Sequence, residues 1–324
     1  MSALQLSAID EAYERIHGIV HLTPLVANRS LADMADCDLV LKAENLQRTG
    51  SFKIRGAFNK TALVHESAGT GVVTGSSGNH GAAVAWAAHY FHLKSHIVVP
   101  ENASPQKVEA AKSYGAEVEF LGTTSQERID RARDISRATG LSFIAPFNDP
   151  DVMAGQGTIG LEILRQLPEV EVIVVPVGGG GLISGIATAV KGKRPDVRVI
   201  GVEPVGAPKA YQSRQRGRLV VLESTNTIAD GLKTLSLGEE TYPIVERLVD
   251  DIVLVDDDEI RRAMLLLLSR QKMLAEPSGA ATLAYVLRKP ERVRHHKTVA
   301  VISGGNIDPT TLCQLLKSSS ADEL

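Results

Sequence analysis

The chain has 324 residues and carries 35 Lys and Arg against 38 Asp and Glu, a formal charge of −3. This near balance argues against the basic surface of proteins that bind nucleic acid or anionic membranes. With 44% hydrophobic and 23% charged residues the chain is expected to fold around a sizeable core. Two cysteines are too few for a disulfide framework, and the first residues contain no long apolar run, so a cytoplasmic protein is expected.

Short β-branched runs alternate with amphipathic stretches along most of the chain. The pattern predicts helices at 9–19, 52–65, 78–91, 105–114, 125–139, 157–167, 182–191, 258–272 and 278–287. Strands are predicted between them at 39–43, 71–74, 96–99, 118–121, 172–175, 198–202, 252–255 and 298–302. Such alternation is typical of a parallel sheet with crossover helices.

These strands are too many for one compact sheet, and the stretch from 71 to 147 is a complete βαβαβα set. We therefore expect an α/β protein of two domains, each an open, mainly parallel twisted sheet with helices on both faces. Residues 1–68 and 149–324 are predicted to form a large domain, and residues 69–148 a smaller, mobile domain inserted into it.

Four turns rich in glycine or other small residues follow predicted strands or open predicted helices, at 49–53, 75–81, 178–181 and 303–306. In an α/β sheet such turns share the edge where ligands bind. The run Gly178, Gly179, Gly180 and Gly181 precedes a helix whose first amides are unpaired, which predicts an anion site. The same segment, with Ser184 and Glu203, also nearly satisfies a dinucleotide-binding fingerprint.

Lys53 stands out because it lies in an otherwise small, neutral turn. Its neighbours Phe52 and Arg55 predict a setting that lowers the pKa of the amine and makes it a nucleophile for a carbonyl. A phosphate site combined with a nucleophilic lysine points to a phosphorylated aldehyde held as a Schiff base. The alternative is an ordinary solvated surface lysine.

Several motifs occur together and in order: SFKIRGA at 51–57, SSGNH at 76–80, GQGT at 155–158, GGGG at 178–181, EPSG at 276–279 and SGGN at 303–306. Together they resemble the serine/threonine dehydratase and serine racemase family, pyridoxal-phosphate enzymes of the tryptophan-synthase β type (fold type II). The resemblance extends from about residue 23 to residue 308. It implies pyridoxal 5′-phosphate as cofactor.

The resemblance also implies roles for individual residues. Lys53 matches the lysine that holds the cofactor and then acts as base, and Ser303 the residue that faces the pyridine nitrogen. The remaining cofactor-binding positions are Phe52 beside the ring, Asn79 at the 3′-oxygen and Gly178 to Gly181 at the phosphate. The turn that matches the cradle for the substrate carboxylate comprises Ser76, Ser77, Gly78, Asn79 and His80.

A hydroxyl at Ser303 stabilises a protonated pyridinium less well than a carboxylate would, which favours β-elimination over transamination. The implied reaction is the conversion of a small β-hydroxy L-amino acid, threonine or serine, into a 2-oxo acid and ammonia, an ammonia-lyase activity. The alternatives are a serine racemase or a dehydratase of 3-hydroxyaspartate or another longer β-hydroxy amino acid. More remote is a non-catalytic dinucleotide-binding module, which needs only the glycine loop and Glu203.

Three positions bear on these alternatives. Ser77 matches the serine that serves as acid and base on the second face in serine racemases, although a helix-capping hydroxyl explains it equally well. Arg128 matches an arginine that holds a second substrate carboxylate in the same branch, against which stands a solvated helix arginine.

Glu203 matches the first carboxylate of a divalent-metal site in that branch, but Lys209 stands where the second acid belongs. Since an ammonium there repels Mg²⁺, we expect no metal and an ion pair between the two residues. The partner is thus a small amino-acid substrate, and the resemblance suggests a homodimer or homotetramer.

Overall fold

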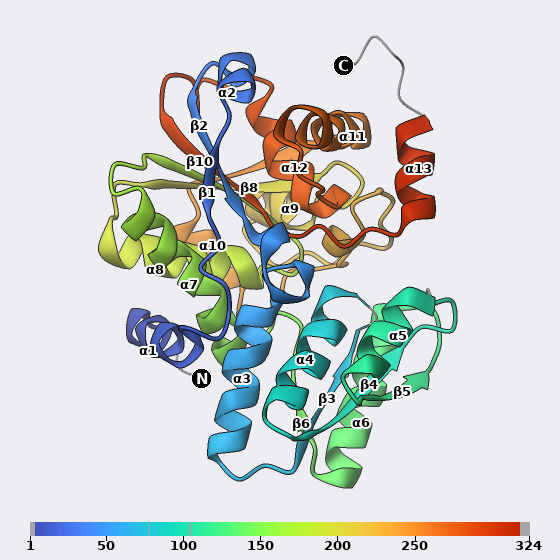
Figure 1. The fold of residues 1–324 in the computed structure, drawn as a ribbon. Helices are drawn as coiled ribbons and strands as arrows, with labels where there is room; N and C mark the ends of the chain where they lie inside the picture. Colours follow the sequence, from blue (N-terminus) through green and yellow to red (C-terminus); the bar gives the residue numbers. More distant parts are fainter. Residues whose placement is uncertain (1–3, 77, 104, 318–324) are drawn as a thin grey trace.

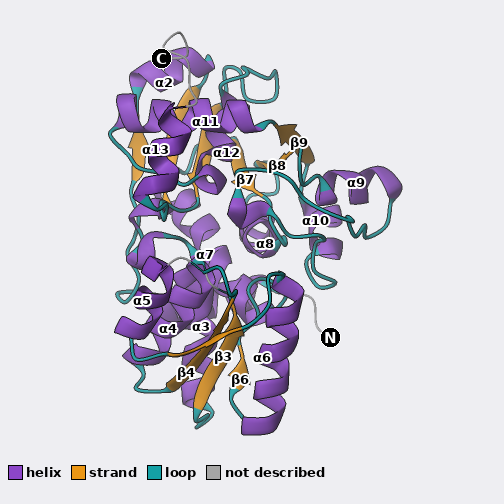
Figure 2. Cartoon of the chain, turned by 90° about the vertical axis from the view of Figure 1, so that its right-hand side faces the viewer, coloured by secondary structure: helices purple, strands orange, loops and turns teal. Residues whose placement is uncertain are grey.

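The computed structural model describes residues 4–76, 78–103 and 105–317 and contains two sheets (Figures 1 and 2). The six-stranded sheet has the order β1 (Leu25–Ala27), β2 (Asp38–Ala43), β10 (Lys297–Ile302), β7 (Val172–Pro176), β8 (Arg198–Pro204) and β9 (Asp251–Val255). The four-stranded sheet has the order β5 (Glu117–Phe120), β4 (Lys94–Val99), β3 (Gly71–Gly75) and β6 (Ser142–Phe143). All pairs are parallel except β1 with β2.

Helices cover both faces of the six-stranded sheet. Because successive strand residues point to opposite faces, Val172 and Val174 join a core with α11 (Asp257–Leu266) and α12 (Pro277–Val286). Ile173 and Val175 join a core on the other face with α7 (Pro150–Gln166) and α8 (Gly181–Lys193). Val174 of β7 pairs in parallel with Ala300 of β10, and parallel strands of this kind are usually covered on both faces. Both faces of the central strands are therefore buried.

The helices of the described residues are α1 (Leu6–Ile16), α2 (Arg29–Ala35), α3 (Lys53–Glu66), α4 (Asn79–Tyr90), α5 (Pro105–Ser113), α6 (Ser125–Thr139), α7 (Pro150–Gln166), α8 (Gly181–Lys193), α9 (Lys209–Arg216), α10 (Tyr242–Leu248), α11 (Asp257–Leu266), α12 (Pro277–Val286) and α13 (Pro309–Lys317). Short single turns lie at Glu44–Leu46 (η1), Arg48–Gly50 (η2) and Asp230–Leu232 (η3). A π-helical turn, Leu267–Gln271 (η4), continues α11. Figure 1 shows α4, α5 and α6 around the four-stranded sheet.

The predicted α/β class with two mainly parallel sheets is confirmed, and every predicted strand is present. The strands that were not predicted, β1 and β6, have three and two residues, too short to show a period. The helices α2, α9, α10 and α13, of seven to nine residues, were not predicted either. The predicted boundaries of the two domains stay a prediction.

Helix α7 begins well before the expected residue 157, because Asp149 caps it and Pro150 occupies its first position. The GQGT motif at 155–158 therefore lies entirely inside this helix. A Cβ at Gly155 would lie 2.5 Å from the carbonyl oxygen of Arg55, so glycine lets α7 approach α3 closely. No helix in the described ranges is long and apolar enough to cross a bilayer.

Candidate active site

A cleft of about 480 Å³ opens at the carboxyl ends of β3, β7 and β10. Its walls come from distant segments: the starts of α3, α4 and α12, the β7–α8 loop, η3, α6 and the residues after β10. The predicted site residues that line it are Phe52, Lys53, Ser76, Gly78, Asn79, His80, Arg128, Gly178, Gly179, Gly180, Gly181 and Ser303. Ser77, the remaining predicted residue, lies outside the described residues.

Lys53 is the first residue of α3 and extends into the cleft. Its Nζ donates a hydrogen bond of 2.7 Å to the carbonyl oxygen of Pro146 and lies 5.2 Å from the centre of the Phe52 ring. Burial lowers the pKa of Lys53 to about 8, although the charge of Glu276 acts in the opposite direction. An appreciable share of this amine is therefore unprotonated, and nucleophilic, near neutral pH.

The predicted effect of Arg55 on Lys53 is wrong. Arg55 is fully buried on the far side of α3, where its guanidinium donates to both oxygens of Glu44, at 2.8 Å each. It also donates to both oxygens of Glu162, at 2.6 and 2.9 Å. Its charge is thus neutralised locally, and burial, not the arginine, lowers the pKa of Lys53.

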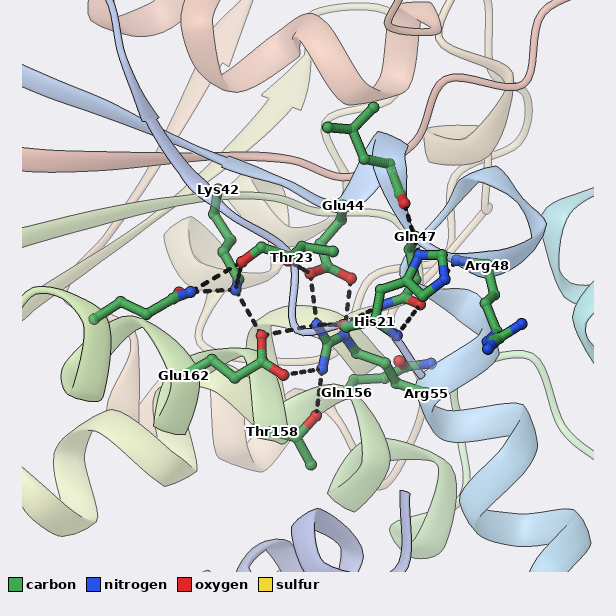
Figure 3. A network of polar contacts seen from close by, with 12 residues as sticks. His21, Thr23, Lys42, Glu44, Gln47, Arg48, Arg55, Gln156, Thr158 and Glu162 are labelled. Atoms are coloured by element: carbon green, nitrogen blue, oxygen red, sulfur yellow. Dashed lines mark hydrogen bonds and ion pairs between the residues drawn. The ribbon is translucent and has the colours of Figure 1, made fainter. Parts of the chain in front are cut away.

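Figure 3 shows that the Arg55 guanidinium belongs to a larger buried network. Lys42 donates a 2.6 Å hydrogen bond to Glu162 and a 2.7 Å bond to the carbonyl oxygen of Thr23. Two cations therefore face two carboxylates among side chains that are almost completely excluded from solvent. Since Arg55 lies in the first turn of α3, the network holds the start of the helix that carries Lys53.

The glycine loop links β7 to α8 and forms the wall of the cleft from Gly178 to Gly181. Gly180 is the N-cap of α8 and has a φ of +92°, a backbone conformation that glycine adopts readily and residues with a Cβ rarely adopt. The first amides of a helix have no partner within the helix and carry its positive dipole end. They are suited to hold a phosphate at this wall.

Ser303 follows β10 directly and is buried to 3% exposure. Its carbonyl oxygen accepts a 3.1 Å hydrogen bond from the amide of Phe52, and Ser51 forms an isolated antiparallel bridge with Gly304. The turn after β10 is therefore tied to the turn that carries the candidate lysine. These contacts bring residues more than 250 positions apart in the sequence to one end of the cleft.

Asn79 connects the start of α4 to the start of α12 and to the segment after β10. Its Nδ2 donates a 2.7 Å hydrogen bond to Glu276, and its Oδ1 accepts a 2.8 Å bond from Asn306. The motif at 276–279 is part of the sequence resemblance, but no role was predicted for Glu276. A carboxylate directly before Pro277 at the start of a helix was the available signal.

The turn before α4 provides hydroxyl and amide groups and a neutral histidine. Ser76 Oγ accepts a 3.4 Å hydrogen bond from the amide of Gly78. His80 is buried, its Nε2 lies 3.1 Å from the carbonyl oxygen of Ile144, and its Nδ1 has no partner among the described residues. Burial, with the nearby charge of Lys53, lowers the pKa of His80 to about 3, so the ring is neutral and donates from Nε2.

Arg128 is not a solvated helix residue. It is only 7% exposed, lines the cleft from α6, and donates to the carbonyl oxygen of Thr124 at 2.8 Å and to Ser125 Oγ at 3.2 Å. Its Nε has no partner among the described residues. Burial lowers the pKa of Arg128, while the charges of Glu127 and Asp230 oppose the shift. The predicted position near the substrate is thus compatible with the geometry.

Glu203 and Lys209 form the expected ion pair, at 2.8 Å, and both side chains are fully buried. Glu203 also accepts from the amides of Ala210 and Tyr211, at 3.0 and 2.9 Å. A carboxylate held in this way is not available to a ribose hydroxyl, which removes the acidic residue that the dinucleotide alternative needs. Within the described part of the chain no three His, Cys, Asp or Glu side chains are grouped to hold a metal.

Residues 16–304 match the family model described as pyridoxal-phosphate dependent enzyme. The L-threonine ammonia-lyase of Geobacter sulfurreducens is 45% identical over 310 residues, which cover 95% of this chain and 77% of that protein. The serine racemase of Arabidopsis thaliana is 43% identical over 323 residues, 98% of this chain and 97% of that protein. The structure of maize serine racemase matches with a TM-score of 0.92 and 42% identity, and 98% of both chains is covered.

The residues of the cleft fit pyridoxal 5′-phosphate. A partly unprotonated amine for its aldehyde and helix amides for its phosphate lie on walls of the same cavity. The resemblance seen in the sequence motifs is confirmed, and with it the cofactor. The chain belongs to the family of pyridoxal-phosphate dependent enzymes.

Proposed function

We propose that this enzyme is an ammonia-lyase that dehydrates small β-hydroxy L-amino acids, threonine and serine, to a 2-oxo acid and ammonia. The observation that carries the proposal is that Lys53 and the glycine loop from Gly178 to Gly181 open onto one cleft. Support comes from a relative named L-threonine ammonia-lyase that is 45% identical to the chain.

The residues of the chain supply binding and proton transfer. When bound, the cofactor supplies an aldehyde that condenses with amines and a ring that accepts electron density from Cα. The Nζ of Lys53 removes the α-proton as general base, a role that suits an amine whose pKa is about 8. Ser76 and Asn79, at the N-terminal end of α4, hold the substrate carboxylate.

Ser303 adjusts the reaction outcome. A neutral hydroxyl beside the pyridine nitrogen stabilises negative charge on the ring less well than a carboxylate in the same place would. The electron pair from Cα is then better released by expelling the β-hydroxyl, which would leave as water with the proton that Lys53 Nζ took from Cα. Elimination is therefore favoured over transamination.

A second candidate, favoured by Arg128, is action on a substrate with two carboxylates or racemisation. The guanidinium is partly desolvated, lines the cleft and has an unpartnered Nε, so it suits a second carboxylate such as that of 3-hydroxyaspartate. A relative named serine racemase is 43% identical to the chain. A role of Ser77 as the second acid and base belongs to this candidate.

Closure of the cleft is part of the proposal. We assign residues 69–148 to a smaller domain that moves against the domain formed by residues 1–68 and 149–324. In support, Asn79 and Arg128 line the cleft from α4 and α6, which lie around the four-stranded sheet, whereas the glycine loop follows β7 of the six-stranded sheet. Closure around the substrate excludes water from the reacting atoms.

The assembly and location complete the proposal. We assign the enzyme to the cytoplasm as a homodimer or homotetramer. Both cysteines are free, Cys37 buried and Cys313 exposed, which suits a reducing compartment. The oligomeric state rests on the sequence resemblance, and light scattering of the purified protein measures it directly.

A substrate panel tests the activity. Purified enzyme with cofactor is incubated with L-threonine, L-serine, D-serine and threo-3-hydroxyaspartate, and both the 2-oxo acid and the chirality of the remaining amino acid are measured. Formation of 2-oxo acid from threonine or serine is expected. Its absence, with turnover of hydroxyaspartate or racemisation of serine, selects the second candidate.

Lys53→Ala tests the role of the lysine in the same assay. The variant is expected to lose both the visible absorption band of the bound cofactor and more than 99% of the activity, roughly the 10²–10⁴-fold effect of a general base. Lys60→Ala is the matched control, since Lys60 lies on the same helix and pairs with Asp149 and Asp151. A Lys53→Ala enzyme that keeps the band and its activity contradicts the assignment.

A further inference from the structure

Behind the glycine loop lies a fully buried ammonium surrounded by oxygen atoms. Lys209, the first residue of α9, has its Nζ 2.8 Å from Glu203 Oε1 and 3.1 Å from the carbonyl oxygen of Val177. The carbonyl oxygens of Leu232 and Ala207 lie at 3.1 and 3.3 Å. One carboxylate and three carbonyls thus face a single positive charge.

This set of donors is the kind that holds a hard metal cation, because it consists of oxygen atoms only. The family resemblance implies a divalent metal near Glu203, but the residues present do not fit one. The position between the oxygens is taken by the ammonium of Lys209, whose charge repels a second cation. The pair Glu203 and Lys209 is also neutral, so no charge is left to attract a metal.

The carbonyl partners of Lys209 belong to two walls of the cleft. Val177 directly precedes the glycine loop, and Leu232 ends η3, which lines the cleft as the loop does. The two segments are in close contact, since a Cβ at Gly178 would lie 2.8 Å from the carbonyl oxygen of Gly231. The ammonium therefore joins the two walls from behind.

We propose that Lys209 is a built-in cation that takes the place of a bound metal ion and holds the glycine loop against η3. Lys209 does not line the cleft, so it is a positioning residue for the phosphate of the cofactor and not a catalytic one. The inference rests on the assignment of the loop from Gly178 to Gly181 as the phosphate site. Because the cation is part of the chain, cofactor binding is expected to be independent of added metal.

The first test uses the unmodified protein without cofactor. Its thermal unfolding midpoint is measured with EDTA, Mg²⁺, Ca²⁺ or K⁺ at constant ionic strength, and then the dissociation constant of pyridoxal 5′-phosphate by absorbance titration. Neither quantity is expected to change by more than the replicate error. A midpoint that Mg²⁺ or Ca²⁺ raises by several degrees, or that EDTA lowers, overturns the proposal.

The second test removes the ammonium. Lys209→Ala is expected to weaken the binding of pyridoxal 5′-phosphate by about tenfold or more, the usual effect of losing a positioning partner. The binding of pyridoxal, which lacks the phosphate, is expected to change little. Ammonium, methylammonium or K⁺ is expected to restore binding in a saturable manner, because the variant leaves an oxygen-lined space. Lys193→Ala, which removes an exposed lysine paired with Asp10, is the control and shows none of these effects.

Three results of the second test overturn the proposal: unchanged affinity for pyridoxal 5′-phosphate, an equal loss for pyridoxal, or a loss that no cation reverses. If Lys209→Ala does not fold, the double variant Glu203→Gln with Lys209→Met removes both buried charges. Weak binding of the phosphate form by this variant supports the proposal, and wild-type affinity overturns it. These titrations do not depend on turnover, so failure of the proposed lyase activity is separate from failure of this inference.

Discussion

Replacement of Arg55 by methionine tests whether the buried ion network holds the start of α3. The substitution removes one of two cations and four hydrogen bonds to Glu44 and Glu162, each between 2.6 and 2.9 Å. Of these two carboxylates, the neighbouring Lys42 donates a hydrogen bond to Glu162 and not to Glu44. Glu44 therefore loses the guanidinium that pairs with both of its oxygens.

The expected loss of stability follows from the burial of the charged groups of Arg55, Glu44 and Glu162. Removing one partner of a buried ion pair costs about 3–5 kcal/mol, because a charge is left in a site without water. Arg55→Lys keeps the charge, but an ammonium cannot bridge two carboxylates as a planar guanidinium does. Leaving a buried acceptor unsatisfied makes the lysine variant about 1–3 kcal/mol less stable than the unmodified protein.

The pH dependence has a defined sign. Burial alone would raise the pKa of Glu44, but the charge and hydrogen bonds of Arg55, together with the charge of Lys42 and the hydrogen bond from Thr23, hold it below the ordinary value of 4.5. In Arg55→Met burial prevails, so the folded-state pKa of Glu44 rises above the unfolded value. The folded variant then takes up a proton as the pH falls, and its deficit in stability is largest at neutral pH and shrinks toward pH 4.5.

Urea unfolding of the cofactor-free proteins, followed by tryptophan fluorescence at pH 5 and pH 8, measures both effects. The free energy of unfolding is expected to decrease in the order unmodified protein, Arg55→Lys, Arg55→Met. A loss below about 1 kcal/mol in Arg55→Met would mean that the network contributes little. An equal loss at both pH values would refute the reasoning from buried charge.

Three further predictions concern single groups. The rate at which the cofactor-free protein binds pyridoxal 5′-phosphate should rise with pH with a midpoint near 8, since burial lowers the pKa of Lys53. Stopped-flow absorbance measures this rate, and a midpoint near 10 would contradict the prediction. Gly180→Ala should weaken cofactor binding about tenfold in an absorbance titration, because a side chain at a φ of +92° costs about 1–2 kcal/mol. A thiol reagent at pH 8 should modify the exposed Cys313 well before Cys37, because burial raises the pKa of Cys37 to about 11. Peptide mass spectrometry identifies the modified cysteine, and equal rates at the two cysteines would contradict the prediction.

Local patterns in the sequence predicted the architecture well. The strand at 172–175 and the helix after Gly181 were found within two residues of the expected bounds, because a buried apolar run and a glycine-rich turn are visible without tertiary information. Short elements such as β6 escaped prediction, since two residues contain no period. The helix that contains the motif at 155–158 begins at Pro150 and not at the predicted residue 157, and its glycines serve close packing against α3.

The sequence by itself determined which residue types gather at the ligand-binding edge, because the turns of parallel strands share one side of a sheet. It therefore identified Lys53, the glycine loop and Ser303, and it also anticipated the ion pair of Glu203 with Lys209, which are close in the chain.

Only the tertiary structure decided which distant groups act on one another. It placed Arg55 among Glu44 and Glu162 and away from Lys53, and it brought Glu276 to Asn79. The physical reason is that desolvation and ion pairing depend on packing between elements that are far apart in sequence, and neither leaves a local pattern. The motif thus predicts a role for Lys53, whereas the pKa of its amine is set by the packing of the fold.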